Sequence, residues 1–355
     1  DYYGQKPNIE TLNFKFFSGF EEAVGALNSG DIAGISYLPK NFEQNLVARD
    51  SLNLYKLNLP QSAILFFNQQ RNVLLANKSV RRALSLSIDK DKIIQDILAG
   101  DARLIDGPIL PESFAYNNNI KRPGFNKDEA INLLKNDGWQ IEEIKNEDLA
   151  KAVSLENSED EKIKKEALEK IEMGAGKWLK KDGNFLIIKL STVDSDKNAQ
   201  IIEAIGKMWT EIGVKTTIEI VSSNQVDIKI RKEKNYEALL YSETAGIDPD
   251  VYAFWHSSRA GEGGLNLSSF SNKEADQLLA EARKISDEKL RAEKYYRFQD
   301  IVAEETPAVF LYSPFYAYVQ NKKVKGFSVK NILSPSDRFA NIADWYVKTG
   351  KKLVW

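Results

Sequence analysis

Residues 240–258, LYSETAGIDPDVYAFWHSS, bring several reactive side chains into one short stretch. Glu243 and Asp248 are carboxylates near aromatic rings, and such a pair can act as the acid and base of a carbohydrate-active hydrolase. Asp248 and Asp250 also flank Pro249, and aspartate at such a position commonly forms a turn with its own backbone. We favour the turn for these two aspartates. Glu243 then remains as a possible counter-ion for a cationic ligand.

The other groups in this stretch offer little further chemistry. His256 is the one histidine of the chain, which argues against a His-dependent triad or a site of several histidines. The chain has no cysteine, so disulfides, thiolate zinc sites and a cysteine nucleophile are excluded. Oxygen ligands with the spacing of an EF-hand loop are missing as well. We therefore expect no catalytic residue, no cofactor and no metal.

Three aromatic residues, Tyr241, Tyr252 and Trp255, surround the predicted turn. They suit a hydrophobic core. They also follow the carboxyl end of a predicted strand, where α/β sheets bind ligands. The sequence leaves both positions open, the core and the wall of a cleft.

Length and charge limit the kind of protein. A single core stops growing near ~250–300 residues, so a chain of 355 residues is expected to form two lobes. The formal net charge of -2 argues against nucleic acid as a partner, because phosphate binding needs a basic excess. No apolar run approaches the roughly 18 residues of a membrane span.

Strands and helices are expected to alternate, which indicates the α/β class. Apolar or alternating runs predict strands at 11–17, 32–38, 52–58, 63–68, 185–193, 215–223, 236–243 and 308–320. Helical spacing with capping residues predicts helices within 21–31, 79–100, 126–138, 198–214 and 273–306. The charged stretch 141–176 has few aromatic residues and is expected to be a helical excursion on the surface.

Residues 77–113, NKSVRRALSLSIDKDKIIQDILAGDARLIDGPILPES, carry a recognisable pattern. The run from Ala83 to Lys90 and the later Gly107-Pro108-Ile109 resemble the solute-binding receptors of the oligopeptide/dipeptide/nickel family, which serve ABC importers. DEAINLLKNDGW, SNKEADQLLAEAR and the opening stretch resemble further motifs of that family in the same order. The resemblance covers nearly the whole chain, from residue 1 to about 346.

The resemblance implies an α/β, two-lobed periplasmic-binding-protein-like fold (type II, cluster C) that closes on a ligand by hinge motion. Residues 1–62 and 313–355 would belong to lobe I and residues 63–312 to lobe II. Family members are usually longer, so we expect a fragment or processed form whose first lobe is incomplete and whose N-terminal lipid anchor is missing. Peptide-binding members pair the peptide amino group with an aspartate three residues before the Asp-Pro, where this chain has Ala245.

We expect an extracytoplasmic monomer that captures an oligopeptide or dipeptide between its lobes and delivers it to the permease of an ABC importer. The alternative is a carbohydrate-active hydrolase that uses Glu243 and Asp248 as its acid and base. The residues expected to line the cleft, or in the case of the last two to lie at the hinge, are Tyr241, Glu243, Thr244, Ala245, Asp248, Tyr252, Trp255, Phe67 and Asn68.

Overall fold

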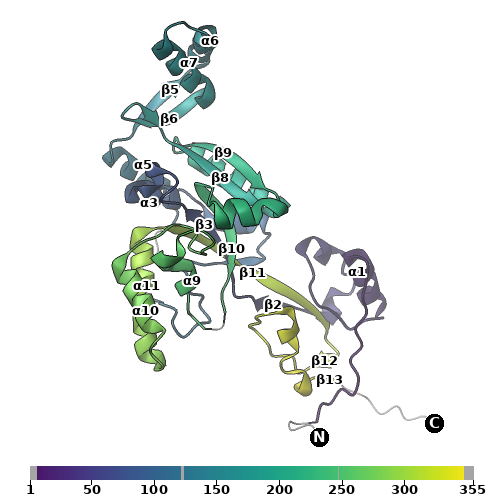
Figure 1. Ribbon diagram of the computed structural model, residues 1–355. Helices are drawn as coiled ribbons and strands as arrows, with labels where there is room; N and C mark the ends of the chain where they lie inside the picture. Colours follow the sequence, from purple (N-terminus) through teal and green to yellow (C-terminus); the bar gives the residue numbers. More distant parts are fainter. Residues whose placement is uncertain (1–5, 121–123, 247, 348–355) are drawn as a thin grey trace, which may run out of the picture.

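A computed structural model describes residues 6–120, 124–246 and 248–347. Its ribbon shows two bodies joined by one long strand, β11 (Ala308–Asn321) (Figure 1). We call the body that carries the helices α3 (Lys78–Leu86), α10 (Lys273–Ala282) and α11 (Glu288–Glu305) the larger lobe. The smaller lobe is the body that carries α1 (Phe20–Ser29), β2 (Leu52–Asn58), β12 (Val324–Lys325) and β13 (Tyr346–Val347). The expected lobe segments 1–62 and 313–355 include residues 1–5 and 348–355, which lie outside the described residues.

One sheet runs through both lobes, in the order β1-β11-β3-β10-β8-β9, with β2 and β4 paired to β11. Strands β8, β9 and β10 are parallel, whereas β3 is antiparallel to both β10 and β11. Residues 62–67 of β3 are all buried, as expected for a strand covered on both faces. The strands are β1 (Gly34–Ile35), β2 (Leu52–Asn58), β3 (Gln61–Phe67), β4 (Ala102–Leu104), β8 (Ile187–Val193), β9 (Lys215–Val221) and β10 (Ala238–Thr244).

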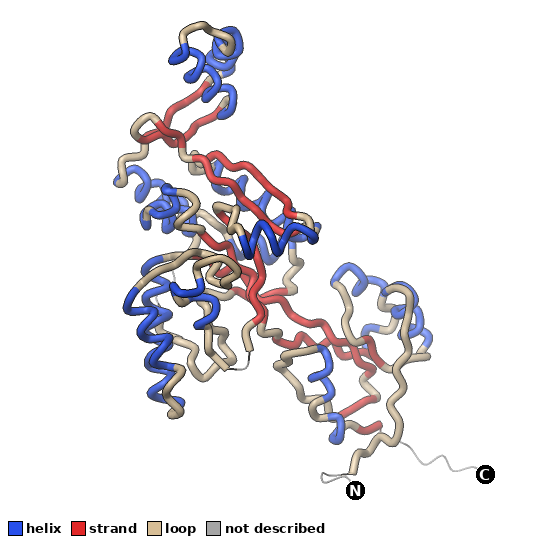
Figure 2. Tube along the Cα trace, viewed as in Figure 1, coloured by secondary structure: helices blue, strands red, loops and turns tan. Residues whose placement is uncertain are grey.

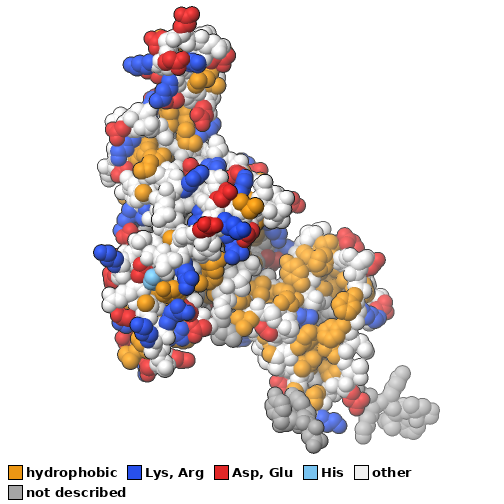
Figure 3. Space-filling model, in the orientation of Figure 1, with side chains coloured by type: hydrophobic (Ala, Val, Ile, Leu, Met, Phe, Trp, Pro, Cys, Tyr) orange, Lys and Arg blue, Asp and Glu red, His pale blue; other side chains and the backbone are white. Residues whose placement is uncertain are grey.

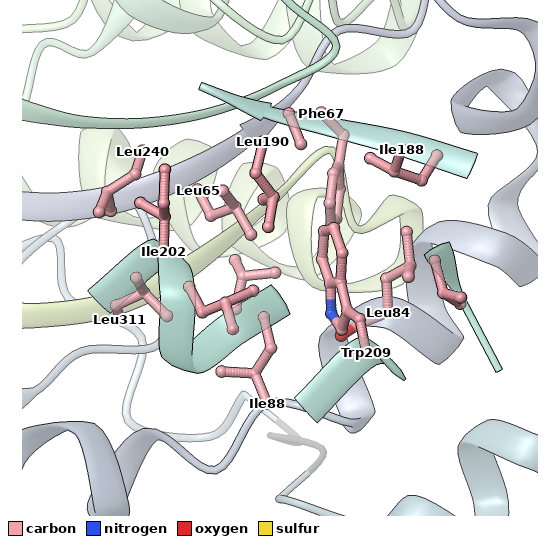
Figure 4. Close-up of a cluster of buried hydrophobic side chains, with 14 of the residues drawn as sticks. Leu65, Phe67, Leu84, Ile88, Ile188, Leu190, Ile202, Trp209, Leu240 and Leu311 are labelled. Atoms are coloured by element: carbon pink, nitrogen blue, oxygen red, sulfur yellow. The ribbon is translucent and has the colours of Figure 1, made fainter. Parts of the chain in front are cut away.

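Helices cover both faces of the sheet in the larger lobe (Figure 2). On one face, Trp209 stacks on Phe67 with ring centroids 6.3 Å apart and donates its indole N–H to the Leu84 carbonyl at 3.1 Å (Figure 4). On the other face, Trp255, Phe66 and residues of α10 and α11 form a second core. The helices are α2 (Val73–Ala76), α3 (Lys78–Leu86), α4 (Lys90–Lys92), α5 (Lys127–Asn136), α8 (Asp196–Thr210), α9 (Tyr252–Trp255), α10 (Lys273–Ala282) and α11 (Glu288–Glu305).

Strand β11 connects the lobes because its two halves have different partners. Its first half pairs with β3 and its second half with β2, and the register shifts between Phe310 and Tyr312. The chain therefore passes between the lobes within β11 and at Leu59-Pro60, between β2 and β3. The smaller lobe also contains α1 (Phe20–Ser29), β12 (Val324–Lys325) and β13 (Tyr346–Val347).

Residues 140–185 project from the larger lobe at the top of Figure 1. They form a small antiparallel sheet with two helices packed on each other, rather than helices alone. The elements are β5 (Gln140–Ile144), α6 (Asn146–Leu155), α7 (Glu161–Met173), β6 (Gly176–Lys181) and β7 (Asn184–Phe185).

Two predicted strands of the smaller lobe are wrong or shortened. Residues 11–17 form no strand, and β1 keeps only two of the seven residues predicted at 32–38. Alternating hydrophobicity needs a partner strand, and within the described residues none pairs with 11–17. Phe14 and Phe16 are consequently 59% and 95% exposed, and Figure 3 shows hydrophobic side chains gathered over this lobe.

Candidate functional site

A cavity of about 500 Å³ lies between the two lobes, a size typical of small-ligand sites. Segments far apart in the chain form its wall, and Leu59-Pro60 places it where the chain passes between the lobes. Its lining residues are Asn58, Leu59, Pro60, Pro108, Ile109, Leu110, Glu112, Ser113, Ala245, Gly246, Asp248, Pro249, Val251, Asn331, Ile332, Leu333 and Asp337.

The loop after β10 contributes Ala245 and Asp248 to the wall of this cavity. The backbone N–H of Ala245 donates to the Pro60 carbonyl at 2.8 Å, which fixes the start of the loop. Asp248 Oδ1 accepts from the N–H of Asp250 at 2.9 Å, and Asp250 Oδ1 accepts from the N–H of Tyr252 at 3.1 Å. Both aspartates thus form the predicted turn with their own backbone.

Asp248 is also held by an arginine. The Arg291 guanidinium of α11 donates to both carboxylate oxygens of Asp248, with Nη1 2.7 Å from Oδ2. This interaction lowers the pKa of Asp248. A carboxylate that is ionised, paired and engaged in a turn is poorly suited to act as a general acid.

Glu243 has a different environment from the one expected of a counter-ion. Its Oε1 atom is buried and accepts no hydrogen bond from any described residue. Burial raises the pKa of Glu243 to about 8, because the charged form loses its hydration there. At neutral pH the side chain is therefore mostly protonated and offers little negative charge to a cationic ligand.

Trp255 is a core residue and does not line the cleft. It is fully buried, and its ring packs against Phe66 and Phe310 at centroid distances of 6.0 and 5.5 Å. Tyr252 stacks on His256 at 4.1 Å, with the guanidinium of Arg283 over its ring at 4.6 Å.

Phe67 and Asn68 also lie in the interior, at the end of β3 remote from the lobe junction. Asn68 accepts a hydrogen bond from Ser269 and donates one to the Lys234 carbonyl, which fixes a buried corner. Their position along β3 explains the difference from the prediction. The chain enters the strand from the junction at Pro60, and seven or eight residues later it is deep in the larger lobe.

Tyr241 and Thr244 remain beside the junction, and β10 has an uncovered edge there. Strand β10 pairs with β8 only over Ala238–Leu240, although it pairs with β3 as far as Thr244. Alternate residues direct their backbone groups to opposite edges of a strand. The backbone N–H of Ala245 bonds to Pro60, on the β3 side of the strand. The backbone groups of Ser242 and Thr244 therefore point to the opposite edge of β10. Within the described residues no strand pairs with them there.

A second cavity, of about 150 Å³, lies between the lobes on the opposite face of the sheet. Its wall includes Tyr37 and Lys40 from the smaller lobe and Lys197 and Ser242 from the larger lobe. Sequence patterns did not single out these four residues, since only the fold brings them together. The run from Pro108 to Ser113 can be recognised in the sequence as rich in proline. Its position at the larger cavity is known only from the fold.

In the described part of the chain, every helix is too short or too polar to span a bilayer. No group of three or more acidic or histidine side chains in that part of the chain is arranged to hold a metal ion.

The family model of "Bacterial extracellular solute-binding proteins, family 5 Middle" matches residues 1–264. The oligopeptide-binding protein AppA of Bacillus subtilis is 25% identical over 98% of this chain and 58% of its own length. The structure of AppA with a nonapeptide is similar over 93% of this chain and 58% of that one, with 23% identity and a TM-score of 0.66. NikZ of Campylobacter jejuni with Ni(L-His) is similar over 92% and 60%, with 20% identity and a TM-score of 0.67.

These solved structures share the two-lobed α/β fold, and the chain spans about 58% of the length of AppA. The matched proteins are solute-binding proteins, so the hydrolase alternative built on Glu243 and Asp248 is not supported. The chain belongs to the bacterial extracellular solute-binding proteins of family 5.

Proposed function

We propose that this protein captures a short peptide between its two lobes, outside the cytoplasm, and delivers it unchanged to the permease of an ABC importer. It would act as a monomer, without a cofactor and without making or breaking a bond. The observation that carries the proposal is the uncovered edge of β10 beside the cavities between the lobes.

The backbone of a peptide can complete this edge. Ser242 and Thr244 both direct an N–H and a C=O toward it, and an extended ligand strand would satisfy these groups. Backbone pairing of this kind depends little on ligand side chains, so several sequences can bind. The larger cavity, which begins at Ala245, would receive the adjoining side chains.

Closure would occur at the two places where the chain passes between the lobes. These are Leu59-Pro60 and the middle of β11, where Pro314 follows the shift in register. Few residues need to change their backbone angles for the lobes to close, as in other hinge-closing proteins. The proposal keeps the boundaries between the two lobes at residues 62/63 and 312/313.

The amino group of the peptide would not be bound through an aspartate at position 245. Ala245 carries no charge, Asp248 is already paired with Arg291, and Glu243 is mostly protonated at neutral pH. Affinity would come from backbone pairing and from the walls of the cavities instead.

A proline substitution tests the β10 edge. Ser242→Pro removes the N–H that faces the edge but leaves the bonds to β3, so the strand should still fold. Loss of this donor, with a ligand carbonyl left unpaired, should weaken binding of tetra-alanine about tenfold in isothermal titration calorimetry. Ser242→Ala keeps the N–H and serves as the matched control, which should bind like the wild type.

Equal affinities of the proline variant and the wild type, with unchanged thermal unfolding, would contradict the proposed edge. Absence of any peptide binding to the wild type would contradict the proposed function as a whole.

A further inference from the structure

The smaller cavity is lined by lysines from both lobes. Lys40 comes from the smaller lobe and Lys197 from the first turn of α8 in the larger lobe, with Ser242 of β10 in the same wall. Asp101 is the one carboxylate among its lining residues. Asp196, the neighbour of Lys197, does not line it. The cavity therefore presents positive charge from two sides.

The carboxylates near this cavity are already neutralised. Glu43 accepts from Lys40 at 2.9 Å and from Arg49 at 3.1 Å. Asp101 lies 3.0 Å from the ammonium of Lys56 and 3.9 Å from that of Lys40.

Lys197, in contrast, forms no ion pair with any described residue and is exposed at the cavity wall. Lys40, Arg49 and Lys56 pair with the two carboxylates of Glu43 and Asp101, and Lys197 adds a fourth basic group at the cavity wall. An excess of positive charge remains for a ligand.

The larger cavity has the opposite character. Its ionisable lining residues are Glu112, Asp248 and Asp337, and no lysine or arginine lines it. Arg103 and Arg291 bind the first two, while backbone N–H groups bind the third, so none is left to attract a cation strongly. An anionic group of the ligand would still be disfavoured there relative to the smaller cavity.

The geometry of the sheet connects the two cavities to one ligand. Ala238 and Leu240 belong to the core on the face of Trp209, so Ser242 projects from that same face into the smaller cavity. Ala245, three residues later, lines the larger cavity. An extended peptide on the β10 edge sends successive side chains to opposite faces, and it can therefore reach both cavities.

We infer that the smaller cavity recognises a carboxylate of the bound peptide through Lys197 and Lys40, so that a peptide carrying this carboxylate binds more tightly than its uncharged analogue. This inference rests on the proposed function. The carboxylate can come from a Glu or Asp side chain or from the carboxyl terminus of the peptide. Both sources share the chemistry that the ammonium groups recognise.

Calorimetric titration of the whole chain with defined tetrapeptides tests the inference. The probes are Ala-Ala-Glu-Ala, Ala-Ala-Gln-Ala and the carboxyl-terminal amide of each. Wild-type protein should bind Ala-Ala-Glu-Ala about tenfold more tightly than the amide of Ala-Ala-Gln-Ala, which carries no carboxylate. This preference should fall in high salt. Lys197→Gln should remove most of this preference, whereas the matched control Lys207→Gln, at the other end of α8, should retain it.

Two comparisons among these probes, Glu against Gln and a free against an amidated carboxyl terminus, distinguish the two sources of the carboxylate. Sensitivity to Glu against Gln identifies a side chain, and sensitivity to amidation identifies the terminus; either supports the inference if Lys197→Gln abolishes it. Equal affinity for all four probes, or a preference that Lys197→Gln leaves unchanged, would overturn the inference while leaving the proposed function intact. Failure of every probe to bind would instead overturn the proposed function and, with it, this inference.

Discussion

Replacing Glu243 by glutamine should change how the stability of this protein depends on pH. The buried Oε1 atom of Glu243 accepts no hydrogen bond from a described residue, and burial raises the pKa of the side chain from 4.5 to about 8. The folded state therefore keeps this proton over a pH range in which the unfolded chain has released it. Glutamine has a similar shape and cannot ionise, so it removes the effect with little change in packing.

The magnitude follows from linkage between protonation and folding. Each pH unit between the unfolded and folded pKa values lowers the unfolding free energy by about 1.4 kcal/mol. The contribution of Glu243 is fully present below the unfolded pKa and is lost as the pH rises toward about 8. At neutral pH the unfolding free energy lost relative to low pH is about 3 kcal/mol. The partial exposure of the rest of the side chain reduces this loss to about 2 kcal/mol.

Urea unfolding at several values from about pH 5 to about pH 8 measures this effect. The stability of Glu243→Gln relative to the wild type should rise by about 2 kcal/mol across the range. Glu262→Gln, at an exposed loop position, is the control and should show no such trend. A constant difference between Glu243→Gln and wild type would refute the assignment of a buried, protonated carboxyl.

Other substitutions test the turn and the core. Asp248→Ala should cost about 1 kcal/mol at neutral pH in urea unfolding, because the Asp248 carboxylate in the ion pair with Arg291 is 57% exposed. The lowered pKa of Asp248 means that this contribution is lost in acid, so wild type and variant should converge there; a persistent gap would contradict the ion pair. Trp255→Ala should cost about 3–5 kcal/mol, since it empties a buried site; a loss below about 1 kcal/mol would contradict its burial. Tetra-alanine at 100 times its Kd should stabilise the fold by about 2.7 kcal/mol in thermal unfolding, and an unchanged Tm would contradict binding to the folded state.

Much of the larger lobe could be predicted because its signals are local. The apolar run at 63–68 indicates a strand covered on both faces, and β3 is that strand. Asn126 caps α5 by accepting from the N–H of Glu129 at 3.0 Å, and Gly138 ends it with a φ of +94°. Such signals depend on neighbours along the chain, which the sequence displays directly.

The site could be predicted only in part because it depends on distant segments. The turn at Asp248 is local and was predicted correctly, whereas the burial of Trp255 depends on Phe66 and Phe310 from two other strands. An aromatic residue after a strand fits a core and a cleft equally well until those partners are known. The role inferred for Lys197 likewise depends on the fold, which places it in the wall of the same cavity as Lys40.

Hydrogen exchange at the β10 edge tests the central claim most directly. In the free protein the amides of Ser242 and Thr244 face an edge that no described strand covers, and they should exchange quickly. A saturating tetrapeptide should slow their exchange strongly, while the Glu243 amide, which faces β3, should already be protected without ligand. Binding measured by calorimetry without added protection at Ser242 and Thr244 would contradict capture of the peptide along this strand.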